Sequence, residues 1–477
     1  MVKSELSSVP QLHIDAETLV RLDRPCPRYT SYPTADRFSE DVRQKEHQEA
    51  LAKADAQVDR PLALYFHLPF CPTLCTYCGC TVVVSKSETK RQEYLAALGK
   101  EMEMICEYLA QRREVVQLHL GGGTPNACTP DELSGLLANV RKRFSFVDDA
   151  ELSLEVDPRR VEPGQLQKLA DIGFNRVSMG VQDFSLDVQE AIGRHQTIAE
   201  TKQAVDDAKA AGFKSVNLDL VYGLPAQTLP DFKHTIEEVL KMNPDRVALF
   251  SFAYVPHVRP HQKKIPVVKL VKAPKKAELF LFAREAFLAA GYVAVGMDHF
   301  AKPDDTLAIA AQDGSLRRNF QGYTFFSDSS GTSVSDGAEL LGFGMSGISE
   351  VGDGYFANPR RYNDYMDAIS EERFPVARGV LRNDEDRICA AIIEHLMCQF
   401  KLENDWVKEE FNLDLLQDFP VAQQKLAPLV DEGLVERQGE DLIVTDVGRF
   451  FVRLVAACFD ARWHRDDDDG PRYSQAV

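Results

Sequence analysis

Four cysteines lie close together in the segment HLPFCPTLCTYCGC, residues 67–80. Cys71, Cys75 and Cys78 have the spacing C-x3-C-x2-C, and Cys80 follows after a single glycine. Clustered thiolates bind either a structural zinc ion or an iron–sulfur cluster. Structural zinc sites usually draw their ligands from two separated cysteine pairs, whereas one loop carries all four sulfurs here. The spacing therefore favours, over structural zinc, an iron–sulfur cluster held by three thiolates, with one iron open to a small molecule.

The segment GGGTP, Gly121 to Pro125, is a second candidate for ligand binding. Glycine lets the backbone approach a ligand closely because it has no Cβ. In isolation, a plain turn or a phosphate loop would show the same residues. The cysteine loop one strand earlier, with an aromatic residue directly before its third cysteine, favours a shared site.

Both segments follow short apolar runs that alternate with longer amphipathic stretches. The expected strands are LALYFHL (62–68), VVQLHL (115–120), ELSLEV (151–156), RVSMGV (176–181), SVNLDLVYGL (215–224) and RVALFSFA (246–253). Strands that alternate with helices in this way indicate a parallel α/β fold. The pattern permits a partly closed barrel or an open sheet, and in both of them ligands bind at the carboxyl ends of the strands.

Candidate ligand-binding residues follow every expected strand. The cysteine loop follows the first strand, and GGGTP follows the second. The third strand ends near Glu155 and Asp157, the fourth near Gln182, the fifth near Asp219 and the sixth near Ala253. Because the carboxyl ends of parallel strands meet at one edge, we expect these residues to form a single site.

The composition excludes several classes of function. The chain of 477 residues is too long for one ordinary core, and its 44% hydrophobic and 27% charged residues are typical of a globular protein. The formal net charge of −18 argues against a nucleic-acid partner. The sequence has no apolar run of about eighteen residues and no apolar signal core near its start. We therefore expect a cytoplasmic protein without membrane insertion whose clustered cysteines bind a metal.

The flanking sequences suggest further regions. The first region contains RPCPRYTSYPT, which is too rich in Pro and Thr for a helix, and GYVAVGMDHFA is expected to extend the sheet. The last part is predicted to form a helix, a hairpin and a helix, and its acidic character favours a packing or lid role over DNA binding. A Ser/Gly-rich loop is expected at 325–340. The regions are an N-terminal arm (1–60), a catalytic domain (61–380), a helical domain (381–465) and an acidic tail (466–477).

Longer motifs resemble the radical S-adenosylmethionine superfamily and, within it, the family of oxygen-independent coproporphyrinogen III oxidases. They are LYFHLPFCPTLCTYCGC, LHLGGGTP, SLEVDPR, NRVSMGVQDF, NLDLVYGLP, GMDHFA, NFQGYT, PRYTSYPT and GDGYFANPRRYNDYM. The match covers nearly the whole chain. The resemblance implies an α/β fold with a partial (βα)6 TIM-like barrel of parallel strands. It also implies an N-terminal arm, a C-terminal mostly helical, winged-helix-like domain, and a monomer.

The resemblance also implies cofactors and the residues that bind them. Cys71, Cys75 and Cys78 would ligate a [4Fe–4S] cluster with S-adenosylmethionine on its fourth iron, while Cys80 matches a cysteine that is not a ligand. Two S-adenosylmethionine molecules are expected per chain. Residues matching those that line the first are Tyr65, Gly122, Glu155 and Ile348. Residues matching those that line the second are Tyr77, Gly123, Thr124, Gln182, Arg194, Asp219 and Ala253.

The implied reaction converts two propionates of coproporphyrinogen III to vinyl groups, giving protoporphyrinogen IX in oxygen-independent haem synthesis. An electron from an unidentified low-potential donor would reduce the cluster. Cleavage of S-adenosylmethionine would then give the 5′-deoxyadenosyl radical that takes a hydrogen from the propionate. The cofactor carries this chemistry, so no side chain is expected to be an obligatory acid or base. Four substrate carboxylates require local cations, for which Arg28, Arg317 and Arg318 are candidates.

Two alternatives remain open from the sequence. The first is a haem carrier that kept the cluster and lost the oxidase activity, although such relatives generally lack the PRYTSYPT arm and the extra cysteine that are both present here. The second is a zinc-stabilised regulator acting through the winged-helix-like end. His67, His119 and His299 are expected to be packing or hydrogen-bonding residues rather than ligands.

Overall fold

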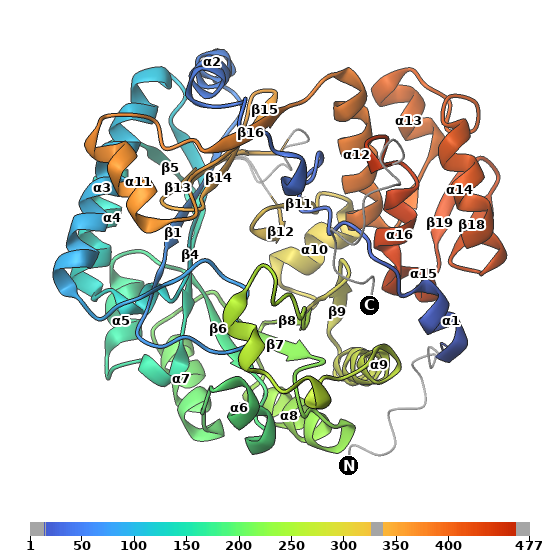
Figure 1. Cartoon of the computed structure of the whole chain (residues 1–477), viewed down its shortest axis with the longest axis horizontal. Coiled ribbons are helices and arrows are strands. Elements are labelled where there is room, and N and C mark those ends of the chain that lie inside the picture. The colour runs from blue at the N-terminus through green and yellow to red at the C-terminus, as the bar shows by residue number, and fades with distance from the viewer. Residues whose placement is uncertain (1–13, 15, 326–336, 464–477) are drawn as a thin grey trace.

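The computed structural model describes residues 14, 16–325 and 337–463. The acidic tail (466–477) and most of the expected loop at 325–340 lie outside the described residues. A twelve-stranded sheet forms the centre of the molecule, in the order β16-β15-β14-β13-β1-β4-β5-β6-β7-β8-β10-β9. Its two edge strands do not pair with each other, so the sheet is an incomplete barrel (Figure 1).

The six expected strands form consecutive parallel neighbours in this sheet, which confirms the predicted parallel α/β fold. Their order in space follows their order in the chain, as expected when each strand is joined to the next by a helix. The strands are β1 (Leu62–Leu68), β4 (Glu114–Gly122), β5 (Ser145–Val156), β6 (Arg176–Gln182), β7 (Ser215–Tyr222) and β8 (Arg246–Ser251).

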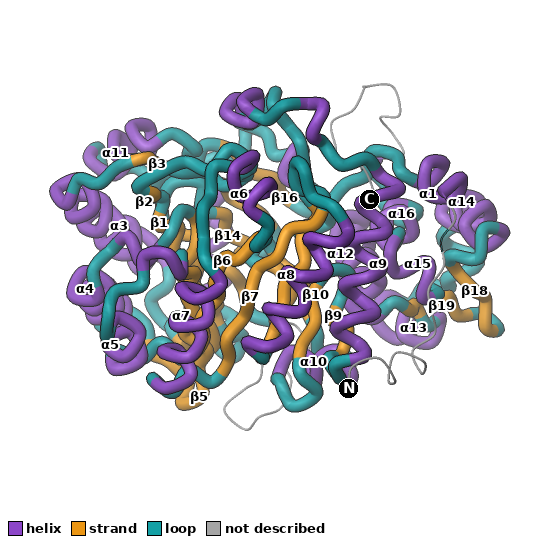
Figure 2. Tube along the Cα trace, turned by 90° about the horizontal axis from the view of Figure 1, so that it is seen from below, coloured by secondary structure: helices purple, strands orange, loops and turns teal. Residues whose placement is uncertain are grey.

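Helices cover the outer face of the curved sheet (Figures 1 and 2). They are α3 (Glu88–Tyr108), α4 (Pro130–Arg141), α5 (Gln165–Asp171), α6 (Leu186–Ile192), α7 (Ile198–Ala210), α8 (Leu229–Met242) and α9 (Ala273–Ala289). Local sequence determines where two of these helices begin. Thr129 and Glu132 form a capping box on α4, and Thr197 and Glu200 form one on α7. The main hydrophobic core lies between these helices and the sheet.

The two faces of the sheet differ in polarity because side chains alternate along each strand. In β5, Leu152 and Leu154 are buried against the helices, whereas Ser153 and Glu155 project from the other face. The same alternation recurs in neighbouring strands. The polar side chains on the concave face include Tyr65, His67, Gln117, His119, Glu151, Ser153, Glu155, Arg176, Ser178, Asn217 and Asp219. The concave face is therefore the place for a polar ligand.

The sheet extends beyond the predicted strands on both sides. At one edge, β9 (Val293–Val295) and β10 (His299–Ala301) add antiparallel strands, as expected for GYVAVGMDHFA. At the other, β13 (Glu339–Phe343) pairs in parallel with β1, followed by antiparallel β14 (Ile348–Val351), β15 (Gly354–Ala357) and β16 (Arg378–Leu381). The expectation of a loop through residue 340 is therefore wrong at its end. A short apolar run identifies neither a strand nor its distant partner.

The N-terminal region, expected as an arm, contains two helices. It contains α1 (Ala16–Leu22) and α2 (Gln44–Asp55), while the stretch between residues 26 and 33 is not helical, as expected. Side chains of this stretch bond to the C-terminal end of the chain. The Tyr29 hydroxyl donates to Asp460 at 3.0 Å, and Arg453 Nε donates to the Pro27 carbonyl at 2.9 Å.

The C-terminal region is mostly helical, with a small sheet in the order β17-β19-β18. Its elements are α12 (Asp384–Gln399), β17 (Lys401–Leu402), α13 (Asn404–Phe411), α14 (Pro420–Asp431), β18 (Val435–Gln438), β19 (Asp441–Val444), α15 (Asp446–Phe450) and α16 (Val452–Ala457). The predicted order of helix, hairpin and helix is present as α14, β18–β19 and α15. Among the described helices, none has both the length and the apolar composition to cross a membrane.

Candidate active site

The cysteine loop lies directly beyond the carboxyl end of β1. Two short strands hold its base, β2 (Phe70–Cys71) and β3 (Val83–Val84), which pair in parallel. On its far side, the Thr76 amide donates to the Ile192 carbonyl at 2.9 Å, so the loop is anchored to the end of α6. Cys71, Cys75 and Cys78 are all free and half-buried.

The three thiols of the cysteine loop are a donor set that fits an iron–sulfur cluster. Cys71, Cys75 and Cys78 lie on one loop, and each is partly accessible to a cofactor. Thiolates are the usual ligands of such clusters. Cys80 is exposed, and its hydrogen bond to the Cys78 thiol lowers the pKa of Cys78 to about 7. A lowered pKa favours the thiolate, which is the form that binds metal.

The glycines at the end of β4 allow this strand to pack against the cysteine loop. A Cβ on Gly123 would lie 2.6 Å from the Pro69 backbone, and one on Gly122 would lie 2.7 Å from the His67 ring. Gly122 also has a φ of +117°, which side-chain-bearing residues rarely adopt. The Gly123 amide donates to the Leu68 carbonyl at 2.8 Å. Glycine is therefore required here to bring β1, β4 and the cysteine loop together.

Next to these glycines, Tyr65, His119 and Glu155 form a contact group on three neighbouring strands. The Tyr65 and His119 rings stack with centroids 6.0 Å apart, and His119 Nε2 lies 3.6 Å from Glu155 Oε1. The Gly122 amide donates to Glu155 Oε2 at 3.2 Å. Burial alone would raise the pKa of Glu155, but the hydrogen bond and charge of His119 and the Gly122 amide outweigh it and lower the pKa. Glu155 is thus an ionised acceptor on the concave face.

Asp219 of β7 lies in the same concave face with a different protonation preference. Its two oxygens accept hydrogen bonds from Ser178 Oγ at 3.0 Å and Asn217 Nδ2 at 2.7 Å. Burial, and then the charge of Glu155, raise the pKa of Asp219 to about 6. The site therefore holds two carboxylates whose pKa values are moved in opposite directions, which is typical of functional sites.

Arg194 reaches the ends of β5 and β6 from the turn after α6. One Nη2 donates to the Gly180 carbonyl at 2.7 Å and lies 3.3 Å from Asp157 Oδ1. Its Nε is buried and has no hydrogen-bond partner among the described residues. Gln182 ends β6 with a φ of +68°, and its side chain lies next to Gly180 and Arg194. A buried guanidinium with an unused donor is suited to bind a carboxylate.

Tyr77, Ala253 and Thr124 connect the cysteine loop to other strand ends through their backbones. Gln262 Nε2 donates to the Tyr77 carbonyl at 3.1 Å and to the Ala253 carbonyl at 3.2 Å. The Thr124 amide donates to the Phe70 carbonyl at 3.0 Å, and its hydroxyl donates to Asn126. The structure therefore brings these three predicted residues to the rim of one site.

Ile348 lies on the opposite flank, at the start of β14. Its backbone approaches Gly342 so closely that a Cβ on this glycine would lie 2.3 Å from the Ile348 carbonyl oxygen. Gly342 is in register with Tyr65 of the adjacent β1. Ile348 is thus in the same cross-strand row as Tyr65, although a distant part of the sequence supplies it.

The candidate substrate-binding arginines do not all lie in one place. Arg28 and Arg318 both lie near Asp298, and their charges help to lower its pKa against the effect of burial. Arg28 is exposed, yet desolvation by the surrounding protein lowers its pKa. Arg318 has its guanidinium 4.5 Å from the Tyr323 ring centroid. Arg317 instead lies near Glu394 of α12, whose pKa burial raises and the charge of Arg317 only partly brings back.

Two residues of this region, Asp298 and His119, were not among the predicted ligand-binding residues, whereas Asp157 was expected at the end of its strand. Asp157 pairs with Arg159 at 2.7 Å as well as with Arg194, and Asp298 accepts from His299 at 2.7 Å. His119 is predicted to be a packing or hydrogen-bonding residue, and it bonds to Ser153 Oγ at 2.7 Å and lies next to Glu155. The sequence contained one signal that His119 lies near the site. His119 precedes Gly121 of the GGGTP segment by two residues, so both lie on one face of a strand.

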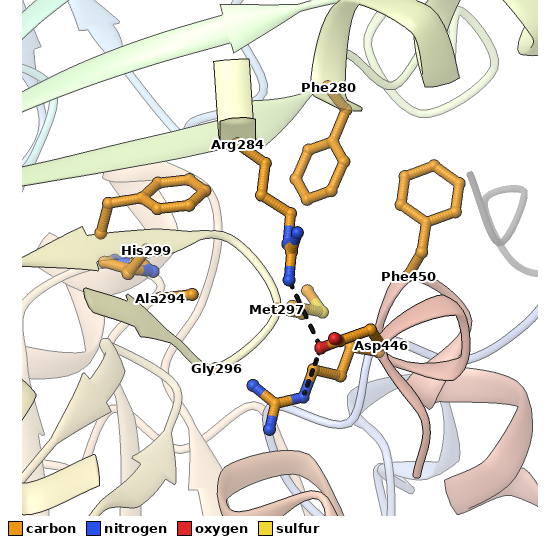
Figure 3. Close-up of a pocket in the computed structure, with 10 residues that line it drawn as sticks. Phe280, Arg284, Ala294, Gly296, Met297, His299, Asp446 and Phe450 are labelled. Carbon is orange, nitrogen blue, oxygen red and sulfur yellow. Dashed lines mark hydrogen bonds and ion pairs between the residues drawn. The ribbon is translucent and has the colours of Figure 1, made fainter. Parts of the chain in front are cut away.

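A separate small pocket lies where the sheet edge meets the C-terminal region (Figure 3). It is bounded by α9, the β9–β10 hairpin and α15. Arg284 of α9 pairs with Asp446 at 3.4 Å, and Phe280 packs against Phe450 with ring centroids 5.0 Å apart. Of the predicted residues only His299 lines this pocket, so it is a contact between regions rather than the candidate active site.

The chain resembles known proteins along nearly all of its length. A model of the radical SAM superfamily matches residues 65–239, and a model of the HemN C-terminal domain matches residues 383–451. The oxygen-independent coproporphyrinogen III oxidase of Pseudomonas aeruginosa is 38% identical over 448 residues, covering 94% of this chain and 95% of that protein. The oxidase of that name from Escherichia coli is 38% identical over 453 residues, covering 95% and 96%.

A solved structure is similar over the same extent. It is coproporphyrinogen III oxidase (HemN) from Escherichia coli, described as a radical SAM enzyme. It superposes with a TM-score of 0.86 at 38% identity, covering 94% of this chain and 99% of that chain. The likeness includes the incomplete barrel and the C-terminal helical region.

Proposed function

Because this chain belongs to the family of oxygen-independent coproporphyrinogen III oxidases within the radical SAM superfamily, we propose that it oxidatively decarboxylates two propionates of coproporphyrinogen III. The product is protoporphyrinogen IX, a precursor in haem biosynthesis. One observation carries the proposal: the C-x3-C-x2-C loop lies at the carboxyl ends of parallel strands, beside Glu155 and Asp219 on a polar concave face. No observation favours the haem-carrier or zinc-regulator alternatives.

The proposed cofactors are a [4Fe–4S] cluster and two S-adenosylmethionine molecules. Cys71, Cys75 and Cys78 would hold the cluster. When bound, these groups supply the one-electron chemistry that removes a hydrogen atom from a substrate propionate. The chain itself contributes binding, orientation and exclusion of water, and no side chain is needed as an obligatory acid or base. The electron is expected from an external low-potential donor.

We assign the first S-adenosylmethionine to the flank of the site near β1. Tyr65 and Ile348 share one cross-strand row, and Gly122 and Glu155 bond to each other beside it. The cofactor carries an amino group and a positively charged sulfonium. Glu155, held ionised by its neighbours, is suited to accept from such cationic groups.

We assign the second S-adenosylmethionine to the strand ends between the cysteine loop and β8. Arg194 supplies a buried guanidinium whose Nε is free to donate to a carboxylate. Burial, and then the charge of Glu155, raise the pKa of Asp219 to about 6, so near neutral pH it is mostly ionised and can accept a hydrogen bond. The full proposed set is Tyr77, Gly123, Thr124, Gln182, Arg194, Asp219 and Ala253.

Arg28 and Arg318 are proposed to bind carboxylates of the substrate. They lie on separate chain segments and share Asp298 as a neighbour, so they provide local positive charge within an acidic protein. Arg317 is a further candidate, although its charge also acts on the nearby Glu394.

Charge reversal by Arg28→Glu should raise the KM for coproporphyrinogen III by about tenfold to a hundredfold, since it removes a charge-assisted contact and adds repulsion. Iron content should stay unchanged, because Arg28 is outside the cysteine loop. The exposed Arg24→Glu, in the same segment, is the matched control and should leave KM unaltered. An unchanged KM in Arg28→Glu would remove this residue from the substrate site.

The function is tested by anaerobic incubation of the protein with dithionite, S-adenosylmethionine and coproporphyrinogen III. We expect 5′-deoxyadenosine and a divinyl product, measured by chromatography and mass spectrometry. 5′-Deoxyadenosine without a vinyl product would contradict the proposed substrate. Stoichiometric haem binding without turnover would instead indicate a haem carrier.

We further propose that the chain is divided into four regions. They are an N-terminal arm (1–60), a catalytic domain (61–380), a helical domain (381–465) and an acidic tail (466–477). We propose that the protein acts as a monomer. We also propose that it acts in the cytoplasm, because thiols remain reduced there and the ten cysteines, all within the described residues, form no disulfide.

A further inference from the structure

One segment of this acidic chain has no acidic residues. Between residues 246 and 277 there are eight Lys or Arg residues and no Asp or Glu, although the whole chain has a formal net charge of −18. The segment joins β8 to α9, and we call its part from 254 to 272 the basic segment. A local reversal of charge on this scale creates a field that attracts anionic partners.

The basic segment lies directly against the cysteine loop. His261 Nε2 is 2.8 Å from the Cys78 carbonyl oxygen, and Gln262 Nε2 donates to the Tyr77 carbonyl at 3.1 Å. Both residues belong to the 3-10 helix η4 (Pro260–Lys264). The backbone of one proposed cluster ligand is therefore one hydrogen bond from this segment.

The surface of the basic segment combines charge with exposed apolar side chains. Val258, Val267 and Val268 have 48%, 66% and 94% of their surface exposed. Lys263, Lys264, Lys269 and Lys272 are also exposed. Apolar contacts surrounded by charges are typical of protein–protein interfaces, in which charges set the encounter rate and apolar contacts contribute to affinity.

We propose that the basic segment is the docking surface for an acidic one-electron carrier protein. This inference rests on the proposed function, which consumes one electron for each S-adenosylmethionine cleaved. The reduced carrier, a flavin or iron–sulfur protein, loses one electron, and the protein gains it at the cysteine loop. Charge complementarity selects an acidic partner. The contact with the Cys78 backbone places that partner beside the proposed electron acceptor.

The test uses reduced and oxidised plant-type ferredoxin as an acidic carrier. The variant K263E/K264E/K269E/K272E should bind oxidised ferredoxin about tenfold or more weakly than the unaltered protein at about 20 mM ionic strength. Its ferredoxin-dependent turnover should fall by a similar factor. The difference should shrink as salt is added, because salt screens exposed charges.

A matched control reverses four exposed lysines far from the basic segment, in K53E/K100E/K142E/K168E. Lys142 and Lys168 lie at the ends of helices that lead back to the amino ends of the strands, opposite the cysteine loop. The control has the same net charge as the first variant and should bind ferredoxin like the unaltered protein. Equal loss of binding in both variants would overturn the proposal, because net charge alone would then explain the effect.

Further readouts separate this inference from the proposed function. Turnover with dithionite and iron content should be unchanged in the first variant, since a small reductant needs no docking surface. If the first variant does not fold, the milder V267S/V268S replaces it and should also weaken ferredoxin binding.

The outcomes for the proposed function and for the docking surface are distinct. Absence of oxidase activity with dithionite in the unaltered protein would refute the proposed function, while direct binding of ferredoxin would still decide the docking surface. Equal ferredoxin binding by the four-lysine variant and the unaltered protein would overturn the docking surface. So would a different result: sedimentation with anionic phosphatidylserine vesicles that the unaltered protein shows and the four-lysine variant loses.

Discussion

Cys75→Ser should lose the cluster and reduce turnover by at least about a thousandfold, which is the largest effect expected from any single substitution in this protein. The cofactor carries the one-electron chemistry, so the remaining side chains have no alternative route to the product. A serine hydroxyl stays protonated at neutral pH and is a poor ligand for iron, whereas thiolates are the usual ligands of iron–sulfur clusters. Iron and sulfide per chain, and absorbance near about 400 nm, measure the loss.

Cys80→Ser is the matched control for this prediction. Cys80 is exposed and is hydrogen-bonded to the Cys78 thiol, and it is not one of the three proposed ligands. We therefore expect Cys80→Ser to retain the cluster with a modest change in its stability. The buried Cys128→Ser tests the effect of a cysteine outside the loop. Loss of metal in Cys80→Ser to the same degree as in Cys75→Ser, with zinc as the bound metal, would contradict the three-thiolate cluster.

Arg112→Ala should destabilise the protein by about 3–5 kcal/mol, the largest expected loss of stability from removing one ion-pair partner. The Arg112 side chain is completely buried, and the Glu339 side chain is only 1% exposed. Their Nη1 and Oε2 atoms lie 2.5 Å apart, and Arg112 Nη2 donates to the Pro61 carbonyl at 3.0 Å. Truncation would leave the buried carboxylate of Glu339 with less compensation and would remove a donor from the carbonyls of Ala54, Arg60 and Pro61.

This pair joins the start of β13 to the segment just before β4, where Arg112 lies, and Arg112 also bonds to the segment just before β1. Pro61 directly precedes β1, and Glu339 begins β13, which in turn carries β14 and Ile348. Denaturation by urea, followed by far-ultraviolet circular dichroism, should show the lower midpoint in Arg112→Ala. The double variant Arg112→Met/Glu339→Met should be destabilised by less than the sum of the single variants, because it leaves no unpaired buried charge. A strictly additive result would show that the pair does not act as a unit.

The strands that carry most of the site were predictable from local sequence. LALYFHL, RVSMGV and their equivalents are short, rich in β-branched or aromatic residues, and separated by amphipathic stretches of helical length. In a parallel sheet each strand is buried on one face by helices, so the apolar pattern is continuous enough to detect. The order of these strands in space then followed from the right-handed, sequential connections of βα units.

The extension of the sheet through β13 was not predictable in the same way. LLGFG is short and follows a Ser/Gly-rich stretch, so its pattern resembles a loop. It becomes a strand because it pairs with β1, more than 270 residues earlier in the chain. Its Glu339 also needs the buried Arg112, which no local pattern connects to it. Pairing between distant segments is a property of the folded chain, because burial and hydrogen bonding supply the stabilisation.

By itself, the sequence determined the chemical nature of the site: which thiols are clustered, which strand ends carry polar groups, and where glycine removes a Cβ. These properties depend on residue type and spacing along a continuous stretch. The tertiary structure then places His119 next to Glu155, brings Arg28 and Arg318 close enough for their charges to act on Asp298, and brings Arg317 near Glu394. Only it placed the basic segment against the cysteine loop. Such contacts join segments far apart in the chain, and their electrostatics depend on distance and burial, which spacing along the sequence does not specify.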